Sequence, residues 1–299
     1  SPEPGYRADG NCRACMVEIE GERVLAASCI RSPTPNMSVI TASKRAKHAR
    51  RTVMELLIAD QPARETSHDP ESKLWQWADQ INILSSRFPK RGTPQADSSH
   101  PAMRVNLDAC IHCNLCVRAC REVQVNDVIG MAGRGGDSKI VFDFDDPMGQ
   151  STCVACGECV QACPTGALME TSLLNDDGVR INYANDQVNS VCPYCGVGCQ
   201  ITYNKKDDKL LYVDGREGPA NRNRLCVKGR FGFDYITHPH RLKKPLIRRD
   251  EVEKDADDFV NPSNPFTHFR EASWEEALER ASSGFREIRD EHGGNALAG

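Results

Sequence analysis

The sequence has 299 residues, 15 of them cysteine, and a formal net charge of −4 at pH 7. A chain of this length can hold two or more domains, and the lack of a basic excess argues against a nucleic-acid-binding protein. No apolar run reaches the ~20 residues of a membrane span. The cysteines occur in clustered C-x2-C groups and not dispersed as in small secreted domains, which favours metal binding in a reducing compartment and predicts a cytoplasmic protein.

The first 60 residues contain three cysteines with a spacing typical of a small iron–sulfur site. Cys12, Cys15 and Cys29 follow the pattern C-x2-C-x13-C, and a strand-like stretch begins at residues 15–19. Plant-type [2Fe–2S] ferredoxins place three cysteine ligands in one loop and the fourth further along the chain. We therefore predict these three cysteines as [2Fe–2S] ligands whose fourth partner is missing from this sequence. A zinc site with three cysteines and free thiols are the alternatives.

A helix is predicted over residues 41–60, with Thr41 or Ser43 as its N-terminal cap. Its apolar side is supplied by Val53, Leu56, Leu57 and Ile58. The first half of the helix is basic, with Lys44, Arg45, Lys47, Arg50 and Arg51. We interpret this half as a solvated face, in preference to a docking patch for a partner subunit.

Residues 61–97 form a connector in which no cysteine occurs. Trp75 and Trp77 lie in a short helix-like segment, and we expect both to pack onto neighbouring domains. The histidines of this part of the chain are His48, His68 and His100. With no thiol near them in the sequence, we expect them to be surface residues.

Eight cysteines between residues 98 and 175 form two matched runs with the pattern C-x2-C-x2-C-x3-C. This is the ligand spacing of bacterial ferredoxins with two [4Fe–4S] clusters, in which the fourth cysteine of each run binds the other cluster. We assign one cluster to Cys110, Cys113, Cys116 and Cys163. The other is assigned to Cys120, Cys153, Cys156 and Cys159. Two zinc sites are the alternative, although zinc needs only four thiolates and no third cysteine at this short interval.

A third group of cysteines has the spacing C-x2-C-x3-C-x26-C and consists of Cys192, Cys195, Cys199 and Cys226. Four thiolates in this order suit another [4Fe–4S] cluster, and the glycines between them let the backbone donate hydrogen bonds to the sulfurs. A zinc ribbon is the alternative. We predict a hairpin within the long interval, with strands at residues 200–203 and 210–213.

The segments CPYCGVGC at residues 192–199 and LCVKGRFGFDY at residues 225–235 resemble a known family. They look like the cluster-binding start of molybdenum- or tungsten-dependent formate dehydrogenases, which are bis-molybdopterin oxidoreductases. The order of the cysteine motifs resembles the alpha subunit of NAD-linked formate dehydrogenases over essentially the whole chain. The resemblance implies that the missing [2Fe–2S] ligand would precede this sequence. It also implies that Lys228 is an electron relay between cluster and pterin, with a plain surface lysine as the alternative.

These observations predict an α+β, modular iron–sulfur protein. The expected domains are a [2Fe–2S] ferredoxin-like domain with its helix (1–60), a connector (61–97), a two-[4Fe–4S] ferredoxin domain (98–175), a small β-rich [4Fe–4S] domain (186–240) and the start of an α/β molybdopterin domain (241–299). In the last of these, Ser273 and Glu276 form a capping box at the start of a helix. Residues that would act on a substrate are expected beyond residue 299, so we interpret the sequence as part of a longer chain.

The resemblance implies that the complete protein interconverts formate and carbon dioxide at a molybdenum or tungsten centre held by bis-molybdopterin guanine dinucleotide. Electrons would leave through three [4Fe–4S] clusters and one [2Fe–2S] cluster to flavin- and NAD-binding iron–sulfur subunits. A complex I-type iron–sulfur subunit is one alternative, although the one-histidine, three-cysteine site usual there has no counterpart in residues 61–97. A stand-alone electron-transfer protein without a catalytic centre is the other.

Overall fold

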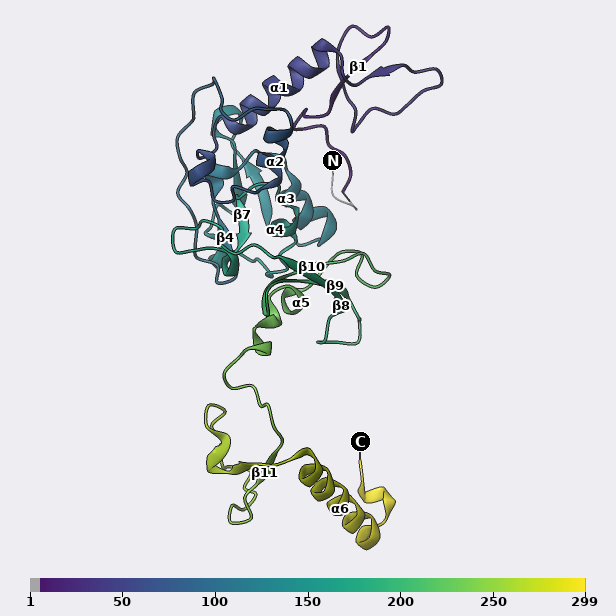
Figure 1. The fold of residues 1–299 in the computed structure, drawn as a ribbon, viewed down its shortest axis with the longest axis vertical. Helices are drawn as coiled ribbons and strands as arrows, with labels where there is room; N and C mark the ends of the chain where they lie inside the picture. The colour runs from purple at the N-terminus through teal and green to yellow at the C-terminus, as the bar shows by residue number, and fades with distance from the viewer. Residues whose placement is uncertain (1–5, 299) are drawn as a thin grey trace. The chain divides into compact units, whose positions relative to one another are not determined.

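The computed structural model describes residues 6–298, which divide between two compact units, Ser1–Phe233 and Asp234–Gly299. The described residues form short helices and small antiparallel sheets, a mixed α+β structure as predicted (Figure 1). The α-helices are α1 (Lys44–Ile58), α2 (Lys73–Gln80), α3 (Leu115–Arg118), α4 (Glu158–Ala162), α5 (Val227–Phe231) and α6 (Trp274–His292). The strands are β1 (Met16–Ile19), β2 (Ala26–Ala27), β3 (Val39–Ile40), β4 (Met103–Val105), β5 (Ile129–Ala132), β6 (Lys139–Phe142), β7 (Leu168–Glu170), β8 (Asp186–Val191), β9 (Gln200–Lys206), β10 (Lys209–Gly215), β11 (Leu246–Arg248) and β12 (Phe269–Glu271).

The first unit begins with a sheet of order β2-β1-β3, which α1 contacts through β1. The predicted strand and helix are both confirmed. Ser43 is the cap, because its Oγ accepts a hydrogen bond from the N–H of Ala46 at 3.1 Å. The apolar side is only partly as predicted, since Ile58 is buried while Leu56 is 52% exposed.

The basic half of α1 does more than face solvent. Arg50 donates a hydrogen bond to the carbonyl of Met16 at 3.0 Å, and Arg51 donates one to the carbonyl of Ile81 at 2.8 Å. These two arginines therefore attach α1 to β1 on one side and to the end of α2 on the other. The interpretation as a solvated face therefore holds for the exposed Arg51 and only in part for Arg50, which is half-buried.

The two tryptophans of α2 have different environments. Trp75 is 4% exposed and belongs to an apolar cluster with Met54 and Ile58 of α1, whereas Trp77 is 55% exposed. Residues two apart on a helix point in different directions, so only one of them can face α1. The expectation that both pack against neighbouring parts of the chain is right for Trp75 and wrong for Trp77.

The ferredoxin module is built on two antiparallel strand pairs, β4 with β7 and β5 with β6. Side chains from these strands, among them Met103 and Ile140, form one apolar core with residues of α3 and α4. A π-helical turn, η3 (Ala119–Val123), follows α3 directly and carries Cys120. Both cysteine runs therefore lie on a single core.

The next sheet has the order β10-β9-β8. Strands β9 and β10 confirm the predicted hairpin. Strand β8 was not predicted, because its sequence DQVNSV is largely polar and its side chains are mostly exposed. Its partner β9 supplies the backbone hydrogen bonds that local sequence does not reveal.

The second unit contains the pair β11 and β12 and the helix α6. The Oγ of Ser273 accepts a hydrogen bond from the N–H of Glu276 at 3.1 Å, which confirms the predicted cap. The apolar side chains of α6, including Trp274, Leu278 and Phe285, are exposed. Within the described part of the chain, none of the helices has the length and apolar character that crossing a membrane requires.

Candidate metal centres

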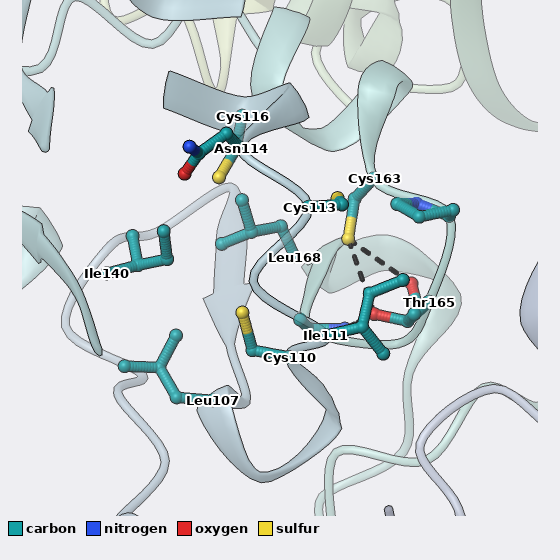
Figure 2. A pocket seen from close by; sticks show the side chains of 12 residues that line it. Leu107, Cys110, Ile111, Cys113, Asn114, Cys116, Ile140, Cys163, Thr165 and Leu168 are labelled. Atoms are coloured by element: carbon teal, nitrogen blue, oxygen red, sulfur yellow. Dashed lines mark hydrogen bonds between the residues drawn. The ribbon is translucent and has the colours of Figure 1, made fainter. Parts of the chain in front are cut away.

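The eight cysteines of the ferredoxin module line two cavities, with four cysteines at each. The first is lined by Cys110, Cys113, Cys116 and Cys163. The second is lined by Cys120, Cys153, Cys156 and Cys159. Figure 2 shows the first cavity, where apolar side chains such as Leu107, Ile140 and Leu168 complete the wall. The structure thus brings together the same two sets that the cysteine spacing assigns, with Cys120 and Cys163 exchanged between the runs; their role as ligands stays a prediction.

The four cysteines of each set line a cavity and do not converge on a site for a single metal ion. Among residues 6–298, no three histidine, cysteine, aspartate or glutamate side chains are grouped closely enough to hold one metal ion. A [4Fe–4S] cube makes a different demand, because each of its irons takes one cysteine at a separate corner.

The two runs share one backbone conformation around their first cysteines. His112 and Ala155 each lie two residues after the first cysteine of a run, and they have φ angles of +52° and +54°. Their N–H groups donate to the Sγ atoms of Cys110 and Cys153, both at 3.4 Å. A left-handed conformation in a residue other than glycine costs roughly 1–3 kcal/mol. Its repetition at matching positions is typical of a loop shaped around a bound group.

A second pair of matching positions leads into the helices. Asn114 has φ of +63° just before α3, and Gly157 has φ of +70° just before α4. Each helix then carries the third cysteine of its run, Cys116 or Cys159, as its second residue. Three thiols of each run are thereby turned toward one cavity.

Burial changes the acidity of these thiols. It raises the pKa of Cys110 to about 11 and that of Cys113 to about 12, and it raises the pKa values of Cys116 and Cys159 well above the usual range. At neutral pH such thiols keep their protons unless a cation takes their place. A metal cluster supplies that cation, because it binds cysteine as thiolate and displaces the proton. The apolar walls, the N–H donors and the four thiols of each cavity therefore fit an iron–sulfur cluster.

The third group of cysteines gathers where β8, β9 and α5 meet. The N–H of Cys192 donates to the carbonyl of Cys199 at 2.9 Å, and Cys226 is the N-terminal cap of α5. Burial raises the pKa of Cys199, and the charges of Cys192, Cys195 and Cys226 raise it further. Cys192 is buried, whereas Cys195 and Cys226 are exposed. This site is therefore open on one side.

Two of the first three cysteines, Cys15 and Cys29, are in contact in the loops beside β1, and Cys12 acts on Cys29 through its charge. Burial raises the pKa of Cys15, but hydrogen bonds from Cys29 and Ser28 outweigh it, and the pKa is lowered. Burial raises the pKa of Cys29, and so do its hydrogen bond with Cys15 and the charges of Cys15 and Cys12. The charge of Cys12 also contributes to the raised pKa of Cys113, a residue that lines the first cavity of the ferredoxin module.

Two buried charged residues of this region were not identified from the cysteine motifs. Arg230 is 0% exposed and Glu158 is 2% exposed, and Arg230 Nη2 lies 3.7 Å from Glu158 Oε2. Arg230 Nε donates to the carbonyl of Cys156 at 3.4 Å. The one available signal is that Arg230 follows Cys226 by about one helical turn. The burial of the guanidinium depends on residues far away in the sequence.

Other polar residues are placed partly as expected. Lys228 lies in α5 with its side chain exposed, and its role as an electron relay stays a prediction. His48 is exposed, in agreement with expectation. The expectation of surface positions is wrong for His100, which is 9% exposed, and for His68, which bonds to Asp108 at 2.9 Å. Distant segments supply the polar partners of the half-buried His68, whereas His100 accepts a hydrogen bond from the nearby N–H of Ala102 at 3.1 Å.

Three known families match successive parts of the chain. A 2Fe-2S iron-sulfur cluster binding domain matches residues 1–44, and a 4Fe-4S dicluster domain matches residues 109–167. A molybdopterin oxidoreductase Fe4S4 domain matches residues 186–238. The three ranges contain the three cysteine regions in the predicted order.

Individual relatives are similar over most of the chain. The "Probable oxidoreductase YjgC" of Bacillus subtilis is 30% identical and the "Putative formate dehydrogenase SH0748" of Staphylococcus haemolyticus is 26% identical, each over 96% of this chain and 31% of the relative. An NADH-quinone oxidoreductase subunit of Rhizobium meliloti is 34% identical over 80% of this chain and 28% of that protein. A chain in the crystal structure of an NAD+-reducing [NiFe]-hydrogenase in the H2-reduced state is 27% identical with a TM-score of 0.51, covering 57% of this chain and 73% of the other.

The chain thus spans about a third of the length of these curated relatives. Within that span, the family matches account for every one of its 15 cysteines. The chain is a mixed α+β protein with 2Fe-2S, 4Fe-4S dicluster and molybdopterin oxidoreductase Fe4S4 domains, an iron–sulfur region that resembles those of formate dehydrogenases and of an NADH-quinone oxidoreductase.

Proposed function

We propose that the chain is the electron-transfer portion of a formate dehydrogenase. In the complete protein, electrons taken from formate at a molybdenum or tungsten bis-molybdopterin guanine dinucleotide centre pass through this region toward flavin- and NAD-binding subunits. Residues 241–299 begin the domain that holds the pterin, and Lys228 relays electrons from it. The observation that carries the proposal is the unbroken succession of cysteine sites within the first unit.

Interactions between the sites support an order of transfer. The backbone N–H of Arg230 donates to the carbonyl of Cys226 at 3.0 Å, and Nε of its side chain donates to the carbonyl of Cys156. Arg230 therefore joins the third cysteine group to the second cavity. The two cavities of the ferredoxin module share one core. The charge of Cys12 acts on Cys113, which lines the first cavity. Electrons that enter near Cys226 can therefore leave near Cys12.

The residues around each cavity prepare it for one-electron transfer. A bound cluster supplies a carrier whose charge is spread over several iron and sulfur atoms. The apolar wall of the first cavity, with Leu107, Ile140 and Leu168, excludes water, and N–H donors such as that of His112 stabilise charge on the sulfurs. Burial and hydrogen bonds of this kind set the reduction potential.

The first test is iron and sulfide analysis of the anaerobically purified chain, with EPR spectra of the reduced form. About twelve irons with interacting [4Fe–4S] signals support three cubes, and about fourteen irons add the [2Fe–2S] cluster. Zinc in place of iron would refute the electron-transfer proposal.

A second candidate is an iron–sulfur subunit of an NADH-quinone oxidoreductase, favoured by the 34% identity to the Rhizobium meliloti protein. The two candidates differ in the source of electrons. In the complete protein, molybdenum or tungsten together with cluster reduction by formate supports the dehydrogenase. A protein without either metal, whose clusters are reduced by NADH and not by formate, supports the second candidate.

The proposed relay role of Lys228 has its own test. Lys228→Met should slow formate-driven cluster reduction without changing iron content.

A further inference from the structure

Arg230 occupies the interface between the ferredoxin module and the Fe4S4 domain. Gln124 Nε2 donates to the carbonyl of Leu225 at 3.1 Å, and Gln161 Oε1 accepts from the N–H of Gly215 at 3.1 Å, so polar contacts cross this interface on both sides. The guanidinium between them is fully buried. A charge in such a position is stable only when nearby groups compensate it.

The contacts of Arg230 divide between the two domains. On the Fe4S4 side, Nη1 donates to the carbonyl of Val213 at 2.9 Å and to Oδ1 of Asp214 at 3.2 Å. On the ferredoxin side, Nε reaches the carbonyl of Cys156 and Nη2 faces Glu158. The planar guanidinium reaches both domains because its donors point in fixed, different directions. Its Nη2 faces Glu158 Oε2 only as an ion pair at 3.7 Å, and neither atom has a hydrogen-bond partner among the described residues.

Gly157 lets the arginine approach the cysteine loop. A Cβ atom at this position would lie 2.7 Å from Cγ of Arg230, and the φ of +70° is unfavourable for other residues. Next to it, Glu158 Oε1 accepts a hydrogen bond from the hydroxyl of Tyr6 at 3.1 Å. The residue pair Arg230 and Glu158 thus lies at the point where the second cavity meets the third cysteine group.

We propose that Arg230 is a positioning residue for electron transfer between the cube held by Cys192, Cys195, Cys199 and Cys226 and the cube held by Cys120, Cys153, Cys156 and Cys159. Its side chain fixes the Cys156 loop against the start of α5, and its positive charge favours the reduced state of the second cube. Asp214 on the Fe4S4 side and Glu158 on the ferredoxin side partly offset that charge. This inference rests on the proposed presence of the two cubes.

The electrostatic part follows from the charge balance of the step. One electron leaves the cube of the third cysteine group, which becomes one charge more positive. It enters the cube of the second cavity, which becomes one charge more negative, and no bond or proton is transferred. A buried cation next to the loop of Cys156 stabilises the added negative charge, and the low polarity of the surroundings strengthens the effect. The neighbouring carboxylate of Glu158 acts in the opposite direction.

The experiment is a reductive titration of the cluster-loaded chain followed by EPR. Arg230→Gln should make the midpoint potential of one [4Fe–4S] cluster more negative by about 59 mV, which corresponds to a tenfold change in the equilibrium constant for one electron. Glu158→Gln should move the same midpoint in the positive direction. Arg230→Lys keeps the charge and should restore the midpoint most of the way.

The matched control is Arg180→Gln, because Arg180 forms a partly buried ion pair with Asp69 at 3.0 Å, and among residues 6–298 its side chain donates hydrogen bonds to Asp69 and to the carbonyl of Asn182 instead of to a cysteine loop. It should leave the midpoints unchanged. If Arg230→Gln does not retain its clusters, the midpoint potentials of Glu158→Gln and Arg230→Lys test the inference instead. Unchanged midpoints, or shifts of the same sign in Arg230→Gln and Glu158→Gln, overturn the inference while the clusters remain. A chain that binds no iron overturns the proposed function itself.

Discussion

His68 joins three separate stretches of the chain. Its Nδ1 lies 3.0 Å from the carbonyl oxygen of Gly178, and its Nε2 lies 2.9 Å from Oδ1 of Asp108. Both partners are acceptors, so both hydrogen bonds form only when the ring is an imidazolium with two N–H donors. Burial alone lowers the pKa of His68, but the hydrogen bond and the charge of Asp108 outweigh it, and the pKa is raised. Burial alone raises the pKa of Asp108, but the hydrogen bond and the charge of His68 outweigh it, and the pKa of Asp108 is lowered.

The stability supplied by His68 should depend on pH. Because its folded pKa is above the ordinary 6.5, its contribution is complete below pH 6.5 and is lost as the pH rises through the folded pKa. The lowered pKa of Asp108 keeps the pair charged down to about pH 4. His68→Gln should therefore reduce the free energy of unfolding by about 1.5–3 kcal/mol at pH 6 and by less at pH 9, measured by denaturant titration. The exposed His48→Gln is the control, and an equal loss at both pH values would contradict the prediction.

At the scale of elements, α1 and α2 form a small core of their own. Met54 and Ile58 of α1 pack against Leu74 and Trp75 of α2, and Ile83 closes the cluster from the following loop. Such a short helix as α2 has little stability in isolation, so this packing determines whether it forms. The N–H of Leu74 also donates to the carbonyl of Pro164 at 3.1 Å, which connects α2 to the residue after Cys163.

The two tryptophans of α2 provide a matched test of this packing. Trp75→Ala should lower the free energy of unfolding by about 3–5 kcal/mol, because it removes a large buried side chain and leaves a cavity. Trp77→Ala removes the same side chain from an exposed position and should change stability by no more than about 0.5 kcal/mol. Thermal or denaturant unfolding of both variants gives the comparison. Similar losses in the two variants would show that the cluster between α1 and α2 is not what stabilises this region.

Local sequence predicts elements whose determinants are local. The cap residues Ser43 and Ser273 were identified because a hydroxyl satisfies N–H groups only a few residues away. Strand β8 and the half-buried position of His68 could not be predicted in this way. Their stabilising partners, β9 for the strand and Asp108 with Gly178 for the histidine, come from other segments.

The same distinction holds for the whole molecule. The grouping of cysteines around the two cavities could be predicted, because C-x2-C-x2-C-x3-C spacing directs three thiols to one cluster and leaves the fourth for another. Arg230 and Glu158 could not be predicted, since their contact joins residues 72 positions apart and depends on the docking of two domains. Spacing along the chain therefore indicates which groups bind a cluster, whereas the groups that adjust its potential emerge only from the packing.

The exchange of cysteines between the two runs leads to a prediction about cluster loss. Cys163 follows Cys159 closely in sequence, yet it lines the cavity of Cys110. Cys163→Ala should therefore reproduce the defect of Cys110→Ala, with loss of up to about four irons and the same residual EPR spectrum. Cys153→Ala, in the same run as Cys163, should remove the other cluster and leave a different spectrum. If Cys163→Ala matched Cys153→Ala instead, each run would bind its own cluster and the crossed arrangement would be wrong. The comparison uses three single substitutions in one background, so a general loss of stability would affect all three spectra alike and could not imitate the predicted pairing.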